Sequence, residues 1–200
     1  MMIVSRGEIE VARVRTFPNA YLNEVETGLL VSLVKSVKPK VMIEIGVQEG
    51  RTAKIVLDNI ITLETYIGID VLPGYEPTLA CQRSEVPRSA GVYASKDPRF
   101  WLLTRQRGSL GIGPQDLEPA DAVFIDGDHS AKAVTHDSFL SRALVRSGGI
   151  IIWHDYNNPA VEVTQVLNML ENQGWPIVAI EGSWLAFCRI GDSYATPQAA

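Results

Sequence analysis

The chain has 200 residues, of which 46% are hydrophobic and 20% charged, as expected for one globular domain with a sizeable core. No apolar run reaches the roughly 18 residues that cross a bilayer, and two cysteines make no disulfide framework, so we expect a cytoplasmic protein without a membrane partner. The net charge of −5 gives no basic field that would attract a phosphate backbone, and we therefore expect no nucleic-acid partner.

Short runs rich in β-branched residues alternate along the chain with longer runs of helical period, a pattern typical of βαβ units around a parallel sheet. Strands are predicted at 40–45, 65–70, 100–104, 121–126, 149–154, 176–180 and 185–190. Helices are predicted at about 21–36, 50–60, 130–145 and 160–173. The last two strands form a hairpin, so the pattern predicts an α/β fold of five parallel strands and a hairpin, with one domain over residues 1–200.

The segments outside this pattern carry separate predictions. Residues 1–20 form an N-terminal extension that either pairs as an edge strand or packs on a partner subunit, and the second alternative would make the protein a homodimer. Residues 191–200 form a frayed tail. Residues 71–99 contain too much Pro, Ser and Gly for a single element and are predicted to be a cap or loop over a site.

The turn EIGVQEG, which starts at Glu44 near the end of the first predicted strand, suits a cationic ligand. In open α/β sheets, ligands bind beyond the carboxyl ends of the strands. Gly46 and Gly50 let the backbone approach a ligand closely, but Gln48 replaces the middle glycine of the dinucleotide fingerprint. Glu44 and Glu49 would repel a pyrophosphate and attract a cation. The turn therefore argues against NAD and favours S-adenosylmethionine, which carries a sulfonium and an ammonium group and no phosphate.

A second acid, Asp70, ends the next predicted strand. Its two carboxylate oxygens suit a vicinal ribose diol, and its spacing after the glycine turn is about that of nucleotide-ribose carboxylates. Together, the two acidic strand ends predict one site for a cation that bears an adenosine.

These residues resemble those of the class I S-adenosylmethionine-dependent methyltransferases, over roughly residues 20–190. The resemblance lies in EIGVQEG, GIDV, FIDGDHS and SGGIIIWHDY, and it is nearest to the branch of small-molecule O-methyltransferases, some of them metal-dependent. It implies a single methyltransferase domain with a Rossmann-like doubly wound sheet, seven strands in the order 3-2-1-4-5-7-6 with strand 7 antiparallel, and helices on both faces. It also implies that Gly108 and Ser109 border the adenine, and that Val71 and Asp126 join Glu44, Gly46, Gly50 and Asp70 in the cofactor site.

Two acids and two histidines stand at or just beyond the ends of the fourth and fifth predicted strands. If these strands are parallel neighbours, their ends lie roughly 5 Å apart, so Asp126 and Asp155 face each other across a small gap. Two such carboxylates need a cation or a proton between them. His129 and His154 stand beside them, which makes this strand edge the predicted centre of the chemistry.

The resemblance implies roles for these four residues. Asp126 and Asp155 would bind a divalent metal, and His129 would be the general base that takes the proton of the acceptor hydroxyl. Related metal-dependent enzymes usually carry an acid where this chain has His154, so fewer hard oxygen ligands remain for Mg²⁺ and Mn²⁺ is favoured. We therefore predict a Mg²⁺ or Mn²⁺ site at Asp126, His154 and Asp155, with His129 and Asp126 catalytic. Asp128 is either a further ligand or, as Ser130 could also be, the cap of the helix that begins near residue 130.

The predicted function is S-adenosylmethionine-dependent transfer of a methyl group to a hydroxyl of a small molecule. One alternative is a module that binds the cofactor without turnover, because His154 and Ala131 replace an acid and a tyrosine that relatives often carry. Another is a methyltransferase with a different acceptor. Trp153, Tyr156 and Trp184 are candidates to line the acceptor pocket, although aromatic residues near strand ends are as often part of the core.

Overall fold

The computed structural model describes residues 1–14, 17 and 21–191, so most of the predicted tail and part of the predicted N-terminal extension lie outside the described residues. Strands and helices alternate through most of the chain, as the periodicity predicts. The strands are β1 (Met2–Val4), β2 (Val41–Ile45), β3 (Thr65–Val71), β4 (Phe100–Arg105), β5 (Ala120–Ile125), β6 (Val145–Trp153), β7 (Val178–Ile180) and β8 (Ala186–Arg189). The α-helices are α1 (Glu24–Ser36), α2 (Arg51–Asn59), α3 (Ala131–Leu144) and α4 (Val163–Asn172).

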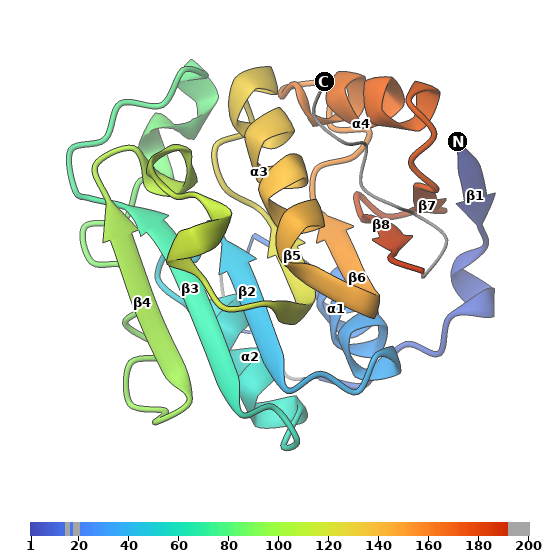
Figure 1. The fold of residues 1–200 in the computed structure, drawn as a ribbon, viewed down its shortest axis with the longest axis horizontal. Helices are drawn as coiled ribbons and strands as arrows, with labels where there is room; N and C mark the ends of the chain where they lie inside the picture. The colour runs from blue at the N-terminus through green and yellow to red at the C-terminus, as the bar shows by residue number, and fades with distance from the viewer. Residues whose placement is uncertain (15–16, 18–20, 192–200) are drawn as a thin grey trace.

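The described strands form one eight-stranded sheet with the order β4-β3-β2-β5-β6-β8-β7-β1 (Figure 1). The first seven positions reproduce the predicted order 3-2-1-4-5-7-6, and β8 runs antiparallel to both of its neighbours, as predicted for strand 7. The sheet has one strand more than predicted, because β1 pairs in parallel with β7 at the edge. A strand of three residues is too short to show an alternating pattern in the sequence.

Of the two alternatives for the N-terminal extension, the structure contains the edge strand, formed by Met2–Val4. The strand is followed by a short 3-10 helix, Arg6–Glu8, and residues 9–14 form neither helix nor strand. Packing on a partner subunit, and with it a homodimer, stays a prediction.

Helices cover both faces of the sheet because successive strand residues point to opposite sides. Met42 packs into the layer formed with α1 and α2, whereas the next residue, Ile43, packs into the layer formed with α3 and α4. The neighbouring strands repeat this alternation, with Phe124 in the first layer and Val123 in the second. The sheet is thus buried on both faces, which explains why its central strands read as continuous apolar runs.

The ends of the helices follow local capping chemistry. The Asn23 side chain accepts a hydrogen bond from the N–H of Glu26 at 3.0 Å, so α1 begins three residues later than predicted. Ser130 is the N-cap of α3, and Asp128 supports it by accepting a 2.9 Å hydrogen bond from the Ser130 N–H. Of the residues considered for capping this helix, Ser130 therefore holds the cap position itself.

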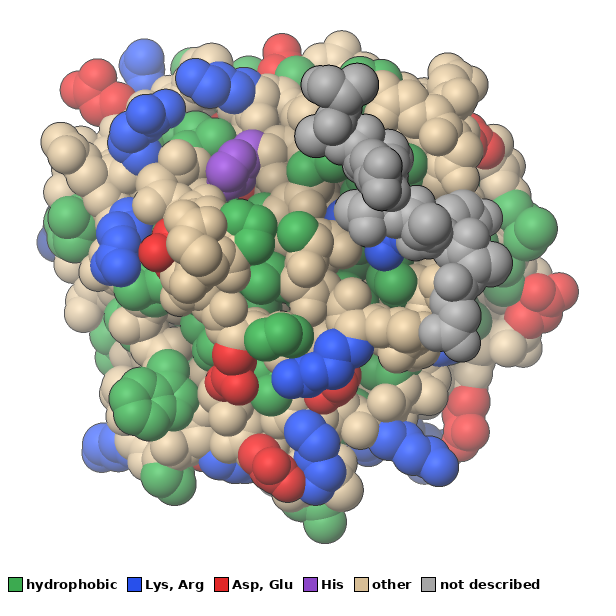
Figure 2. All heavy atoms as spheres, viewed as in Figure 1, with side chains coloured by type: hydrophobic (Ala, Val, Ile, Leu, Met, Phe, Trp, Pro, Cys, Tyr) green, Lys and Arg blue, Asp and Glu red, His purple; other side chains and the backbone are tan. Residues whose placement is uncertain are grey.

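Charges are mixed on the surface. On the face shown in Figure 2, lysine and arginine side chains are interspersed with aspartate and glutamate, and no continuous basic area forms there. Among the helices of the described residues, none combines the length and apolarity that crossing a bilayer requires.

Candidate functional site

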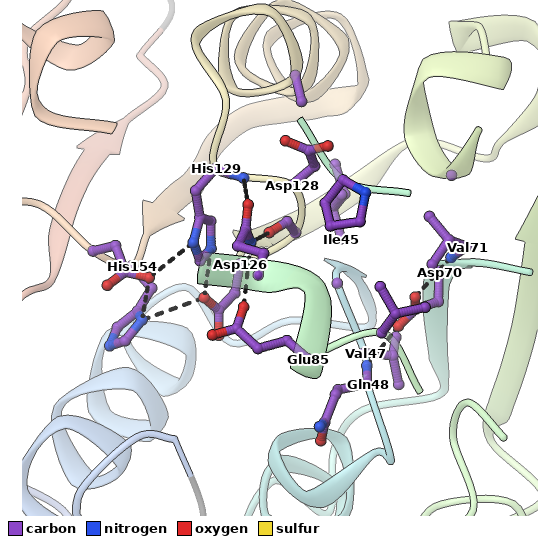
Figure 3. A pocket seen from close by; sticks show the side chains of 18 of the residues that line it. Ile45, Val47, Gln48, Asp70, Val71, Glu85, Asp126, Asp128, His129 and His154 are labelled. Carbon is purple, nitrogen blue, oxygen red and sulfur yellow. Dashed lines mark hydrogen bonds and ion pairs between the residues drawn. The ribbon is translucent and has the colours of Figure 1, made fainter. Parts of the chain in front are cut away.

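A cavity opens beyond the carboxyl ends of β2, β3, β5 and β6, where the sheet order changes direction and where ligands bind in open α/β sheets (Figure 3). Its floor includes Gly46, Asp70 and Asp126. Its cover comes from the segment 71–99, which carries a short 3-10 helix, η2 (Ala80–Ser84), and lines the cavity with Tyr75, Pro77, Cys81, Gln82, Glu85, Val86 and Pro87. The prediction that residues 71–99 form a cap or loop over a site is confirmed.

The glycine turn is held tightly against the neighbouring strand end. Gly46 has φ +90°, and a Cβ there would lie 2.1 Å from the carbonyl oxygen of Asp126, so only glycine fits. Gly50 has φ +85° and packs on the backbone of Gly91. Gly46, Val47 and Gln48 line the cavity, whereas Gly50 shapes the turn from behind.

Asp70 joins the turn to β3 at the cavity wall (Figure 3). One carboxylate oxygen accepts a hydrogen bond from the Gln48 N–H at 2.5 Å, and the other accepts one from the Val71 N–H at 2.6 Å. Burial raises the pKa of Asp70 to about 6, although these backbone N–H groups oppose the shift. The carboxylate is thus fixed in orientation and retains lone pairs for a ligand.

Glu44 does not line this cavity, because alternation along β2 points it to the opposite face from Ile45. Its carboxylate is buried and accepts a 2.9 Å hydrogen bond from the Tyr66 hydroxyl. Burial raises the pKa of Glu44 well above its ordinary value. A direct contact between Glu44 and a cofactor stays a prediction that the geometry of the cavity does not support.

The far wall of the cavity comes from a 3-10 helix, η3 (Gly108–Gly111), after β4. Gly108, Ser109 and Val71 all line the cavity there. Behind them, Asp137 of α3 is fully buried, and its carboxylate meets no hydrogen-bond partner among the described residues. Burial raises the pKa of Asp137 to about 7. Asp137 thus lies in the core and does not line the cavity.

The acids and histidines at the ends of β5 and β6 form one compact cluster (Figure 3). His129 contacts both Asp126 and Asp155, with nitrogen–oxygen distances of 3.3 Å. The Nδ1 atom of His154 lies 3.3 Å from an oxygen of each of the same two carboxylates. Ligand atoms of Asp126, His154 and Asp155 all lie within 4.8 Å of one another. The structure therefore brings together the four residues that the sequence placed at this edge.

Local structure and charge both shape the cluster. Asp155 has φ +61°, a left-handed conformation that costs a non-glycine residue about 1 kcal/mol and that turns the chain sharply after β6. Burial alone would raise the pKa of Asp126, but His154 and His129 hold it well below its ordinary value. Burial alone would lower the pKa of His129, but Asp126 raises it. The carboxylates are therefore held in the ionised form, which binds cations.

Sequence reasoning missed Gln82, a buried residue of the cap. Its side-chain oxygen accepts a 2.8 Å hydrogen bond from the His129 N–H, and its nitrogen donates a 2.9 Å hydrogen bond to the carbonyl of Gly127. Gln82 thus fastens the cap to the turn that carries the cluster. No local signal could have found it, because the pairing joins residues more than 40 positions apart.

The cavity also contains Arg51 and Thr52, at the N-terminus of α2, and Glu85 of the cap. Thr52 carried a usable signal, since a hydroxyl residue at a helix start beside a glycine turn suits an anionic ligand group. Of the aromatic candidates, Trp184 lines the cavity, whereas Trp153 is fully buried and donates a 3.0 Å hydrogen bond to Ser138. Trp153 and Tyr156 pack in the layer of α3 and α4, so the core alternative holds for them.

Comparisons with solved structures show the same fold at low sequence identity. The O-methyltransferase TomG from Streptomyces achromogenes, involved in tomaymycin synthesis and solved in complex with SAM, aligns with TM-score 0.59 and 16% identity over 88% of this chain and 84% of its own. An O-methyltransferase from Bacillus cereus in complex with SAH aligns with TM-score 0.59 and 17% identity over 86% and 84%. The O-methyltransferase NovP aligns with TM-score 0.63 and 14% identity over 88% and 84%.

Comparison with curated proteins gives no match. The model of a family described as a methyltransferase domain matches residues 43–156, which contain the glycine turn, Asp70 and the whole acid–histidine cluster. Because this match spans more than half of the chain, the protein belongs to the methyltransferase domain family.

Proposed function

We propose that the protein transfers a methyl group from S-adenosylmethionine to a hydroxyl group of a small molecule. The observation that carries this proposal is one cavity that joins a glycine turn and a ribose-type carboxylate, Asp70, to a cluster of acids and imidazoles. The structural neighbours TomG and the Bacillus cereus enzyme support it, since they are O-methyltransferases with SAM or SAH bound.

The residues around the first turn would hold S-adenosylmethionine, which supplies the methyl group. Asp70 accepts hydrogen bonds from the ribose hydroxyls, and the backbone of Gly46 admits the ligand closely. Arg51 and Thr52, at the positive end of the α2 dipole, receive the carboxylate of the methionine part. Val71, Gly108 and Ser109 form the adenine end, and Asp126 closes the cavity on the side of the reacting methyl group.

His129 would take the proton of the acceptor hydroxyl. It lines the cavity, and its two nitrogens each lie 3.3 Å from a carboxylate oxygen, Nε2 from Asp126 and Nδ1 from Asp155. Asp126 and Asp155 orient the imidazole and stabilise its cationic form, so they favour proton uptake. The acceptor would enter beside Trp184 and Glu85, which line the same cavity.

Asp126, His154 and Asp155 fit a divalent metal ion by the chemistry of their donor set, two carboxylate oxygens and one imidazole nitrogen within 4.8 Å of one another. A bound Mg²⁺ or Mn²⁺ would lower the pKa of the acceptor hydroxyl. The imidazole donor favours Mn²⁺ over Mg²⁺, which prefers oxygen ligands.

A transfer assay tests the proposal. The protein is incubated with S-adenosylmethionine labelled in its methyl group and pools of small hydroxylated metabolites, with Mn²⁺, with Mg²⁺ and with EDTA. We expect label in an ether product, and we expect His129→Ala to lower turnover about 10²-fold while S-adenosylmethionine still binds. Full activity of His129→Ala would contradict the assigned base, and activity unchanged by EDTA would contradict the metal.

The alternative of a cofactor-binding module without turnover retains one supporting observation, the replacement of a ligand acid by His154. Calorimetry separates the two functions. Binding of S-adenosylmethionine without transfer to any acceptor, in the presence of Mn²⁺, would favour the module.

A further inference from the structure

A buried carboxylate from a distant part of the chain stands behind the acid–histidine cluster. Glu26, in the first turn of α1, is 6% exposed and approaches His154 from the side opposite Asp126. Its two oxygens are held separately. One accepts a 2.8 Å hydrogen bond from the Trp184 N–H, and the other accepts a 2.7 Å hydrogen bond from the Asn23 side chain.

The imidazole of His154 lies between this carboxylate and the cluster. Its Nδ1 atom faces the cluster, 3.3 Å from an oxygen of Asp126 and 3.3 Å from an oxygen of Asp155. Its Nε2 atom lies 3.8 Å from one Glu26 oxygen, the one that accepts the hydrogen bond from Asn23. The Nε2 atom is buried and has no hydrogen-bond partner among the described residues, which leaves Glu26 as the group placed to accept its proton.

This arrangement determines which nitrogen can bind a cation. A histidine that binds a metal through one nitrogen usually donates the other N–H to a carboxylate or carbonyl, which sets the tautomer and the ring orientation. With the proton on Nε2, directed at Glu26, the lone pair of Nδ1 points toward the two aspartates. With the proton on Nδ1, the cluster would lose its nitrogen ligand.

We propose that Glu26 is a positioning residue that directs the Nδ1 lone pair of His154 into the cluster and so makes the site selective for Mn²⁺ over Mg²⁺. The proposal rests on the metal site of the proposed function and assigns to α1 a part in it.

The neighbours of Glu26 explain why it stays in place without binding the metal itself. Asn23 caps the helix and holds one oxygen, and the backbone before β8 holds the other. Burial alone would raise the pKa of Glu26, but the contacts with His154 and with the Trp184 N–H lower it, so the side chain keeps its charge. A fixed anion at this position attracts the imidazole proton.

Titration calorimetry with Mn²⁺ and Mg²⁺ tests the proposal in four proteins: wild type, Glu26→Gln, His154→Asp and the double variant. Glu26→Gln removes the negative charge that faces Nε2 and leaves one amide oxygen for two donors, the Trp184 N–H and the Asn23 side chain, so Nε2 loses its carboxylate acceptor. We expect wild type to prefer Mn²⁺ by roughly tenfold or more. We expect Glu26→Gln to weaken Mn²⁺ binding about 10–100-fold.

The His154→Asp background shows whether Glu26 acts through the imidazole. There we expect Glu26→Gln to change Mn²⁺ affinity less than about threefold, since no nitrogen remains to be oriented. Glu24→Gln, which removes an exposed acid from the same turn, is the matched control and should leave affinity unchanged. Equal losses in both backgrounds would assign Glu26 a structural or general charge role and overturn the proposal.

Two further measurements keep the outcomes separate. The ¹⁵N chemical shifts of the His154 ring in the Mg²⁺-bound protein should show the proton on Nε2 in wild type, and a proton on Nδ1 there would contradict the proposal. Calorimetry with S-adenosylmethionine alone reports on the proposed function independently of metal. Binding of S-adenosylmethionine together with no binding of Mn²⁺ by wild type would reject the role of Glu26 and leave the cofactor site standing.

Discussion

Asp70 is a buried carboxylate, so its ionised form is disfavoured in this fold. A bound ribose nevertheless requires that ionised form. Two backbone N–H groups orient it, and burial raises its pKa to about 6. Only the ionised form accepts from both backbone donors and from a ribose diol at the same time. Affinity for a nucleoside therefore depends on the protonation of this one residue.

We predict that the affinity for S-adenosylmethionine falls as the pH decreases through about 6, because protonation of Asp70 removes an acceptor. Calorimetry between pH 5 and 8 measures it. Asp70→Asn should bind at least about tenfold more weakly at pH 8 and should lose this pH dependence. A variant that keeps the wild-type affinity would remove Asp70 from the site.

Asp137 behaves differently, because it lies in the core and no hydrogen-bond partner meets its carboxylate among the described residues. Its folded-state pKa of about 7 lies above the unfolded value near 3.8. A raised carboxyl pKa means that its contribution to stability is fully present below about pH 4 and is lost as the pH rises through about 7.

We therefore predict that Asp137→Asn is more stable than wild type at pH 8 and that the difference disappears toward pH 4. The wild type should lose roughly 1.4 kcal/mol per pH unit from this group between about pH 4 and pH 7. Urea unfolding at several pH values measures it. The exposed Glu24→Gln should show no such trend, and a pH-independent effect of Asp137→Asn would contradict the buried neutral acid.

At the scale of elements, the site depends on how closely the turn after β2 approaches the end of β5. Gly46 and Gly74 have nearly the same left-handed backbone, with φ +90° and +87°. A Cβ at Gly46 would lie 2.1 Å from a backbone oxygen of Asp126, whereas a Cβ at Gly74 would meet nothing within 4 Å. Comparing alanine substitutions at these two glycines therefore separates the cost of backbone strain from the cost of close packing.

We predict that Gly74→Ala costs about 1 kcal/mol from strain alone, whereas Gly46→Ala costs clearly more and also weakens S-adenosylmethionine binding. The reason is that the turn must move away from Asp126 to make room for the Cβ atom of the alanine side chain. Chemical unfolding and calorimetry of both variants provide the measurement. Equal costs with unchanged binding would show that the turn tolerates displacement.

The cap is the element that local patterns describe least well. Its sequence predicts only an irregular segment, yet Gln82 ties it to the turn carrying His129, and Tyr75 donates a 2.6 Å hydrogen bond to Asp128 of the same turn. These bonds link two segments that local periodicity treats as independent.

At the scale of the whole molecule, the cavity is bounded by the segment before α1, the turns after β2, β3, β4, β5 and β6, and the cap. A ligand in it contacts segments from both halves of the sheet. Binding should therefore stabilise the molecule as one cooperative unit.

We predict that S-adenosylmethionine at about 100 times its Kd stabilises the protein by about 2.7 kcal/mol, which raises the Tm by roughly 5–10 °C for a chain of this size. Differential scanning calorimetry measures the shift. Asp70→Ala, at the same ligand concentration, should show a much smaller one. A shift in only part of a multi-step transition would show that the cavity belongs to a smaller unit.

Local patterns by themselves determined the alternation of strands and helices, the antiparallel last hairpin strand and the edge at which Asp70, Asp126, His129 and Asp155 meet. Periodicity and glycine turns are properties of short segments, and the parallel topology brings strand ends together without further information. Only the tertiary structure decided that Glu44 faces Tyr66 rather than the cavity, that Glu26 stands behind His154, and that Gln82 holds His129. These contacts join segments far apart along the chain and depend on side-chain direction and on packing between layers, neither of which a local pattern contains.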